Sequence, residues 1–387
     1  MSPLTPQELT DRLKAEARRL GFDLVGVTDC TPPASYSAYE AWLQAGHHAG
    51  MAYMASERNR ARRANPRRIL PECESIVVLA VRYFAPQAAP QPADDAAHGR
   101  VAAYAWGADY HDVLLPRLRA LVDFLETEVG HPIPNRYYTD TGPILERDLA
   151  QRAGLGWIGK NAMLIHPRLG SYFFLAEILL GLRLVPDPPF PTDHCGTCTR
   201  CIEACPTNAI LPNRTVDANR CLSYHTIENK GVLPAEIRPR MGDWVFGCDV
   251  CQMVCPWNRR APASGDPAFA PREDVPHPVL AAELRLTPQA FNRKFKGSPV
   301  KRTKRRGYLR NVAIALGNAQ QTRAVPDLSA ALRDAEPLVR AHAAWALGQI
   351  GDRAACHALQ AAFDAETQAE VRAEIAAALT TCERSQP

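Results

Sequence analysis

The sequence predicts an α/β domain, then a compact cysteine-rich domain, and last an α-solenoid of HEAT-like helical repeats. Three observations support this fold class. The first 182 residues contain both helix-like and strand-like apolar patterns. Eight of the twelve cysteines fall within 195–255, and an apolar motif recurs from residue 307 onward. The 387 residues are enough for several domains of ordinary size, each with its own core.

The N-terminal elements are predicted from their caps and apolar runs. Thr5 and Glu8 have capping-box spacing, with Pro6 at the first helical position, and Gly21 ends this helix. A second helix is predicted over 114–129, ending at glycine, and a third after the turn at 140–143. The segments 22–27, 75–84 and 136–139 are predicted strands, 172–182 is another apolar segment, and 86–92 is a predicted loop.

Composition shifts mark the expected domain boundaries. Prolines concentrate at 186–191 and again over 262–278, as is typical of linkers. From residue 307 the motifs LRNVAIALGN, VRAHAAWALGQIG and VRAEIAAAL align at Leu316, Leu347 and Leu379, spaced 31 and 32 residues apart. The predicted domains are therefore 1–188 (α/β), 189–262 (cysteine-rich), 263–306 (a proline-rich, then basic connection) and 307–387 (repeats).

The cysteine spacing carries the strongest chemical signal. Cys195-x2-Cys198-x2-Cys201-x3-Cys205-Pro206 is the bacterial ferredoxin run, in which the fourth cysteine binds a different cluster from the first three. Residues 248–256 repeat the run without its first cysteine, which Cys221 can replace. The spacing predicts two [4Fe–4S] clusters, held by these two sets: Cys195, Cys198, Cys201 and Cys255; and Cys205, Cys221, Cys248 and Cys251.

Structural zinc is the alternative for these cysteines, but paired ferredoxin-type runs fit two cubanes better. The remaining cysteines, scattered through apolar segments, are expected to be inert core residues: Cys30, Cys73, Cys356 and Cys382. Two neighbouring clusters transfer single electrons. They therefore imply an electron-consuming site elsewhere in the chain.

Two further motifs are discounted. Residues 154–161 match both GxGxxG and GxxxxGK, but they follow a helix, and Asn161 occupies the place of the P-loop Ser or Thr. Asp109 and His111 resemble the start of the DxHxxG cobalamin signature, but Leu114 replaces its glycine. We therefore expect neither a nucleotide site nor a cobalt-ligating histidine at these positions.

The charge pattern suggests a polyanionic partner. The formal net charge is +4, yet nine basic residues and no acid lie within 291–310, so the rest of the chain is acidic. Arg310, Arg340 and Arg372 precede the aligned leucines at similar distances and should share one face of the repeats. No apolar run is long enough for a membrane helix, and the N-terminus lacks a signal-peptide core, which favours a cytoplasmic protein.

Six segments together resemble one enzyme family. They are YAWGADYHDVL (104–114), YTDTGPIL (138–145), GLGWIGKN (154–161), GSYFFL (170–175), CLSYHTIE (221–228) and FGCDVCQMVCPWN (246–258). With the cysteine runs, they are similar to the epoxyqueuosine reductases, which complete queuosine synthesis on tRNA. The resemblance extends from about Gly21 to the C-terminal repeats.

The resemblance implies cobalamin in the N-terminal domain, reduced by the two clusters, and an epoxide substrate at the tRNA wobble position. It implies that Asp140 is the proton donor, whereas the residues alone allow equally that Asp140 caps the following helix. Burial beside the corrin would raise the pKa of Asp140 toward neutrality. Without a complete DxHxxG motif, cobalamin should bind base-off. The residues expected around the corrin are Tyr104, Asp140, Lys160, Asn161, Ser171, Ser223 and Asp249.

The basic segment suits tRNA, whose phosphates attract grouped Lys and Arg side chains. The expected contacts are Arg293, Lys294, Lys296, Lys301, Arg302, Lys304, Arg305 and Arg306. A solvated linker is the alternative. An external low-potential electron donor is also implied, and we expect a monomer with no membrane partner. The rival functions are a corrinoid reductase for a small molecule, such as a dehalogenase, and a non-catalytic electron-transfer or RNA-binding scaffold.

Overall fold

The computed structural model describes residues 4–89 and 92–385 and divides into two compact units, neither of which is continuous in sequence. Unit 1 comprises Met1–Ala88, Gly107–Asn219 and Val250–Ala270, and unit 2 comprises Ala89–Trp106, Arg220–Asp249 and Pro271–Pro387. The predicted loop at 86–92 falls partly outside the described residues, and its first part forms a short 3-10 turn, Pro86–Ala88. The three boundaries between the four predicted domains stay predictions.

Unit 1 is built on a four-stranded sheet in the order β1-β2-β7-β4. Its strands are β1 (Leu24–Asp29), β2 (Ser75–Arg82), β4 (Asn135–Tyr138) and β7 (Phe173–Leu180). Every pairing is antiparallel, and Glu177 on β7 lies opposite both Val78 of β2 and Tyr138 of β4. The predicted strands are therefore present, and 172–182 proves to be the strand that joins β2 to β4.

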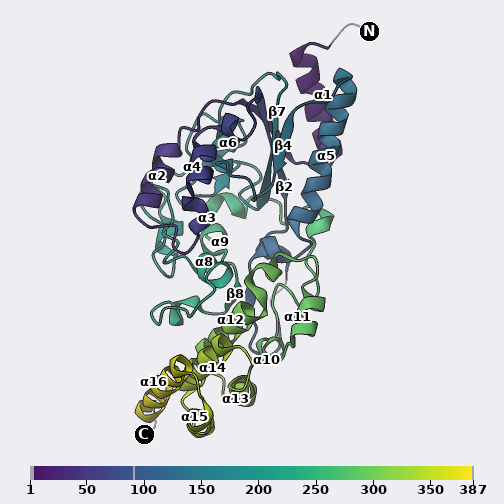
Figure 1. The fold of residues 1–387 in the computed structure, drawn as a ribbon. Coiled ribbons are helices and arrows are strands. Elements are labelled where there is room, and N and C mark those ends of the chain that lie inside the picture. Colours follow the sequence, from purple (N-terminus) through teal and green to yellow (C-terminus); the bar gives the residue numbers. More distant parts are fainter. Residues whose placement is uncertain (1–3, 90–91, 386–387) are drawn as a thin grey trace. The chain divides into compact units, whose positions relative to one another are not determined.

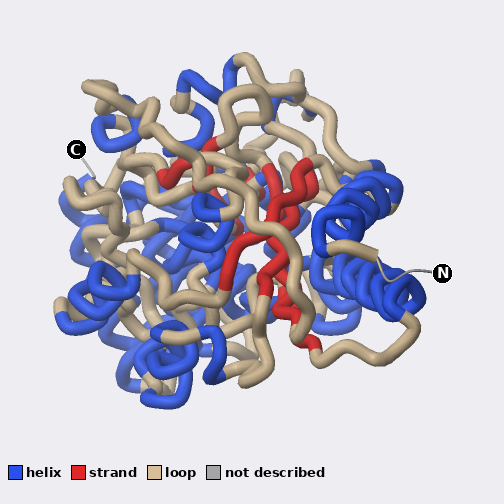
Figure 2. The backbone as a smooth tube through the Cα atoms, turned by 90° about the horizontal axis from the view of Figure 1, so that it is seen from above, coloured by secondary structure: helices blue, strands red, loops and turns tan. Residues whose placement is uncertain are grey.

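Helices cover both faces of this sheet (Figure 1). Helices α1 (Pro6–Arg19) and α5 (Tyr110–Val129) pack on one face, beside the red strands of Figure 2, and α6 (Glu146–Arg152) packs on the other. The capping box at Thr5 and Glu8 and the left-handed Gly130 after α5 are both observed, as predicted. The shorter elements of unit 1 are α2 (Tyr36–Gln44), α3 (Ala52–Ala55), α4 (Glu57–Ala64), β5 (Trp157–Ile158), β6 (Leu164–Ile165), α7 (Arg200–Glu203) and α9 (Val250–Met253).

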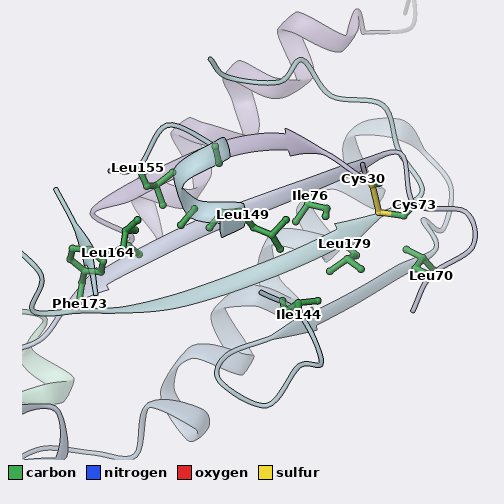
Figure 3. Close-up of a cluster of buried hydrophobic side chains, with 14 residues drawn as sticks. Cys30, Leu70, Cys73, Ile76, Ile144, Leu149, Leu155, Leu164, Phe173 and Leu179 are labelled. Atoms are coloured by element: carbon green, nitrogen blue, oxygen red, sulfur yellow. A yellow bond between two sulfur atoms is a disulfide. The ribbon is translucent and has the colours of Figure 1, made fainter. Parts of the chain in front are cut away.

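The core between the sheet and α6 is apolar and includes a disulfide (Figure 3). Ile76, Leu149 and Leu179 are fully buried there, and Cys30 is bonded to Cys73. The register explains this pairing, since Asp29 lies opposite Ser75 and brings the residues just beyond these strand ends together. A second disulfide joins two helices of unit 2 through Cys356 and Cys382. Cys30, Cys73 and Cys382 are buried, as expected of core residues, but the sequence analysis did not predict that the four cysteines form disulfides.

Unit 2 contains the predicted repeats, stacked as α12, α14 and α16 with α13 and α15 beside them (Figure 1). Leu316 and Leu347 are fully buried, and Gly348 permits close packing because an added Cβ would lie 2.9 Å from the Cβ of Ala378. Among the described residues, no helix has both the length and the apolar character needed to cross a membrane. The elements of unit 2 are β3 (Arg100–Val101), α8 (Leu222–Ile227), β8 (Trp244–Phe246), α10 (Leu280–Leu284), α11 (Pro288–Lys294), α12 (Lys304–Ala319), α13 (Val325–Ala331), α14 (Pro337–Ile350), α15 (Arg353–Ala365) and α16 (Ala369–Ser385).

Candidate iron–sulfur and proton-donor sites

Four of the predicted cluster ligands line one cavity of about 450 Å³ in unit 1. They are Cys195, Cys198, Cys201 and Cys255. Cys195 and Cys198 come from the loop that leads into α7, where Cys198 N–H donates to the carbonyl of Cys195 at 3.0 Å. Cys201 lies in α7 itself, and Cys255 follows α9. The fold therefore joins three cysteines of the first run with the last cysteine of the second, which is the grouping the spacing predicts.

A small hairpin forms one wall of this cavity. Trp157 on β5 and Ile165 on β6 pack against Cys255, and Trp257 lies edge-on to Trp157 with ring centroids 5.1 Å apart. The GWIGKN segment therefore supports the cysteine site instead of forming a nucleotide loop. Its glycines allow close packing, because a Cβ at Gly156 would lie 2.2 Å from the carbonyl oxygen of Ile165.

The electrostatics of the cavity suit a cluster. Burial and the neighbouring thiols raise the pKa values of Cys201 and Cys255, so the protein alone disfavours the thiolates that iron would stabilise. Among the described residues, no three His, Cys, Asp or Glu side chains converge closely enough to hold a single metal ion. Four thiols arranged around a larger cavity fit a cubane better than one zinc ion.

The second predicted ligand set is divided between the units. Cys205 and Cys251 belong to unit 1, where Cys205 Sγ accepts the N–H of Ala209 at 3.2 Å. Cys221 and Cys248 belong to unit 2, and Cys221 is the N-cap residue of α8. Their common ligation of one cluster stays a prediction.

Three residues expected at the corrin are engaged with the cysteine segments of unit 1. Lys160 Nζ donates to the carbonyls of Gly196 at 2.7 Å and Cys198 at 3.0 Å, and Asn161 Nδ2 donates to the carbonyl of Cys251 at 3.4 Å. Ser171 is buried in a network with two side chains of the second cysteine run: its Oγ accepts from Asn258 at 3.0 Å and from Gln252 at 3.1 Å. These contacts position the cluster-binding loops.

The other three corrin candidates lie in unit 2. Asp249 is buried, and its Oδ2 accepts the N–H of Ala103 at 2.6 Å. Burial raises the pKa of Asp249 to about 6. Tyr104 lies beside Phe246, with ring centroids 6.0 Å apart, and Ser223 is in the first turn of α8. Contact of these side chains with cobalamin stays a prediction.

Asp140 follows β4 in a left-handed turn with φ of 58°. Its Oδ2 accepts the hydroxyl of Tyr110 at 2.6 Å, and its N–H donates to Glu146 Oε1 at 2.9 Å. Helix α6 begins only at Glu146, with Leu145 at its N-cap and no side-chain cap bond, so the helix-cap alternative for Asp140 is wrong. The protein leaves Asp140 exposed, so the burial expected for this carboxyl depends on what binds beside it.

The sequence analysis missed two carboxylates behind Asp140. Glu177 on β7 is 0% exposed, and neither of its carboxyl oxygens has a hydrogen-bond partner. Burial, followed by the charges of Glu146 and Asp140, raises the pKa of Glu177 well above its usual value. Burial and the charge of Asp140 raise the pKa of Glu146 to about 7. A single acid within the apolar strand FFLAEILL was the available signal.

The basic segment is only partly available to a ligand. Lys294 pairs with Glu283, Arg302 with Glu228 and Arg305 with Asp334, all within unit 2. Arg310 is fully buried and is therefore not available to a ligand, and a face shared with Arg340 and Arg372 stays a prediction. The remaining predicted tRNA contacts are exposed: Arg293, Lys296, Lys301, Lys304 and Arg306.

Comparisons with known proteins agree with this arrangement. A 4Fe-4S double cluster binding domain matches residues 194–258, which confirms the two-cluster prediction, and HEAT repeats match 306–380. The model "Epoxyqueuosine reductase QueG, DUF1730" matches 63–141. Epoxyqueuosine reductase of Pseudomonas aeruginosa is 38% identical over 91% of this chain and 97% of its own, and that of Escherichia coli is 37% identical over 92% and 93%.

Solved structures give the same result over nearly the whole chain. A crystal structure of an epoxyqueuosine reductase with an epoxyqueuosine-modified tRNA-Tyr stem loop has a TM-score of 0.91 and 32% identity, covering 98% of this chain and 100% of the other. A Bacillus subtilis epoxyqueuosine reductase, with an aspartate-bearing catalytic loop swung out of its active site, has a TM-score of 0.89 and 32% identity, covering 97% and 100%.

Proposed function

This chain belongs to the epoxyqueuosine reductase family, and we propose that it reduces epoxyqueuosine in tRNA to queuosine. The observation that carries the proposal is that reductases of this name match almost the full chain. The family models match 194–258, which contains the cysteines, and 63–141, which contains Asp140. The reaction removes one oxygen from the epoxide. Two electrons and two protons are consumed, both C–O bonds break, a C=C bond forms and water leaves.

We propose that the two clusters supply electrons singly to a cobalamin, which when bound provides the strong reductant that epoxide opening needs. The family resemblance puts Tyr104, Lys160, Asn161, Ser171, Ser223 and Asp249 near this cofactor. We propose that cobalamin binds base-off, because the DxHxxG motif is incomplete: Leu114 replaces its glycine.

The chain's own residues account for the proton donor. The Tyr110 hydroxyl holds Oδ2 of Asp140, which leaves Oδ1 of the exposed carboxyl to carry a proton toward the departing oxygen. The left-handed turn and the bond from Asp140 N–H to Glu146 fix the backbone beneath this carboxyl. Asp140 therefore lies in the loop between β4 and α6 and is held there by contacts with Tyr110 of α5 and Glu146 of α6.

We propose that electrons enter at the cavity lined by Cys195 and its partners. The first cavity is lined by the exposed Arg200, Arg259 and Arg260, and no acid lines it. This charge suits an external low-potential donor protein with an acidic surface.

The remaining partners follow from the substrate. The exposed basic side chains of the 291–306 segment are proposed to contact tRNA phosphates, so binding should weaken steeply with salt. We propose a monomer that acts in the cytoplasm, where tRNA is modified. A corrinoid reductase for a small molecule would not require such a segment, and a scaffold would not require Asp140.

The test is turnover by Asp140→Asn after anaerobic reconstitution with iron, sulfide and cobalamin. The variant should retain iron, cobalt and tRNA binding but lose turnover by roughly 10²–10⁴-fold, the usual contribution of a general acid. Asp123→Asn is the matched control, because Asp123 is an exposed residue of α5, and this variant should behave like the wild type. Normal turnover by Asp140→Asn would refute the acid assignment, and cobalt-free protein would favour the scaffold.

A further inference from the structure

The mechanism does not use Glu177, an acid that is buried deeply within the sheet. Glu177 is on the central strand β7, fully buried, with both carboxyl oxygens lacking a hydrogen-bond partner. Burying an ionised carboxylate without partners is very unfavourable, so such a group is held neutral by a proton. Replacement by leucine would relieve this cost. An unpartnered glutamic acid at this position therefore points to a use for its proton.

The pairing of β7 with β4 places Glu177 near Asp140. Residues alternate along β7, so Glu177 shares a face with Phe173 and Leu179, which belong to the core beneath α6. Tyr138, its cross-strand neighbour, lies two residues before Asp140. Glu146 begins α6, and its Oε1 accepts the Asp140 N–H at 2.9 Å. Asp140 after β4, Glu146 at the start of α6 and Glu177 on β7 are therefore close enough for their charges to interact.

The charges around these groups favour protonation. The negative charges of Glu146 and Asp140 raise the pKa of Glu177. On the neighbouring strand β2, the residue opposite Glu177 is the apolar Val78. The charge of Asp140 raises the pKa of Glu146, whereas the charges of Arg147 on the same helix and of Arg63 on α4 lower it. The hydroxyl of Tyr110 on α5 is directed at Asp140. Cations therefore partly stabilise ionised Glu146, whereas the charges that act on Glu177 within the described residues are those of the acids Glu146 and Asp140.

We propose that Glu146 and Glu177 form a proton store behind Asp140, from which Asp140 recovers a proton between the two protonations of one reduction. This role rests on the proposed function, which consumes two protons while Asp140 carries one. After the first donation Asp140 is an anion, and Glu146 transfers its carboxyl proton to it. Glu177 has no partner at rest, so its side chain must rotate toward Glu146 to return a proton to that residue. Solvent restores the two protons between turnovers. Both residues act through Asp140 and are positioning residues.

The protonation itself can be tested without turnover. Infrared difference spectra of the reconstituted holoenzyme would follow the C=O band of protonated carboxyl groups, identified by its shift in D2O, between about pH 5 and about pH 9. We expect one component of this band to titrate near pH 7 and to be absent from the spectrum of Glu146→Gln. A second component should persist above pH 7 and be absent from the spectrum of Glu177→Gln. Spectra without any protonated carboxyl above about pH 6 would overturn the proposal.

Single-turnover kinetics test the use of the store. Glu146→Gln retains an acceptor for the Asp140 N–H, yet it should slow reduction at least about tenfold at neutral pH and remove the decline in rate near pH 7. Asp148→Asn, on the same helix and bonded to Ser35 N–H, is the matched control and should keep the wild-type profile. A normal rate and profile for Glu146→Gln would refute the store. If even the wild type fails to turn over, the proposed function fails, and the infrared result still decides the protonation.

Discussion

Replacing the buried Arg310 with methionine should destabilise unit 2 and release the second cluster. Arg310 lies in α12 and is 0% exposed. Its Nη2 donates to the carbonyl of His225 at 2.6 Å, and its Nη1 donates to the carbonyls of Asn229 and Gly231, both at 2.8 Å. These carbonyls belong to the end of α8 and the turn after it, and Cys221 is the N-cap of that helix. Arg310 therefore ties the repeats to the segment that carries a predicted cluster ligand.

The expected loss of stability follows from these bonds. Each hydrogen bond from a charged donor contributes about 1.5–3 kcal/mol, and the three are not additive, so we expect Arg310→Met to cost about 3–5 kcal/mol. Burial lowers the pKa of Arg310 to about 9, so the guanidinium is still charged at neutral pH. Methionine fills the apolar part of the site but donates no hydrogen bond, which leaves the three carbonyls without this donor.

The assay is anaerobic guanidinium denaturation followed by circular dichroism, together with iron retention during a chelator challenge. Arg306→Met is the matched control, because Arg306 is an exposed residue of the same helix, and it should change stability by less than about 0.5 kcal/mol. Arg310→Met should unfold at lower denaturant and lose about half of its iron faster than the control. Equal stability and iron retention in the two variants would refute this account of Arg310.

Three further predictions concern the cavity, its rim and the buried acids. Cys255→Ala should lose one cluster, leaving about four of eight irons, and full iron content would contradict the cross-ligation. The double change Arg259→Glu and Arg260→Glu should slow reduction of the clusters by an acidic donor protein, measured by stopped flow. Reduction by reduced methyl viologen should not be slowed, and equal slowing with both reductants would contradict an electron-entry surface at these arginines. Because the pKa of Glu146 rises from 4.5 to about 7, the folded state binds more protons than the unfolded state in that window. The free energy of unfolding should therefore fall by about 3 kcal/mol as the pH rises through this window. Denaturation at a series of pH values measures this dependence, and Glu146→Gln should weaken it. An equal dependence on pH in Glu146→Gln and the wild type would contradict the prediction.

Local signals in the sequence predict much of this fold. The capping box at Thr5 and the glycine at 130 mark helix ends because they act through neighbouring backbone groups. The cysteine spacing predicts which thiols share a cavity, because three of the four lie on one short segment. The repeat period predicts the stacked helices for a similar reason, since each repeat packs on its neighbour.

Long-range features are not available from such signals. The antiparallel order β1-β2-β7-β4 depends on pairing between distant segments, and the Cys30–Cys73 disulfide follows from that register. The basic character of 291–310 does not reveal that Arg310 turns inward toward backbone carbonyls, whereas its neighbours remain exposed or pair with acids. Glu177 could have been noticed in its apolar strand, but its relation to Asp140 required the sheet.

Turnover of a modified tRNA stem loop tests the central claim most directly. The reconstituted protein, a reductant and a stem loop carrying epoxyqueuosine would be incubated anaerobically, and the nucleoside would be analysed by mass spectrometry. We predict a product lighter by one oxygen atom, formed only when iron and cobalamin are both present and abolished by Asp140→Asn. An unchanged nucleoside in protein that holds both clusters and cobalamin would contradict the assignment.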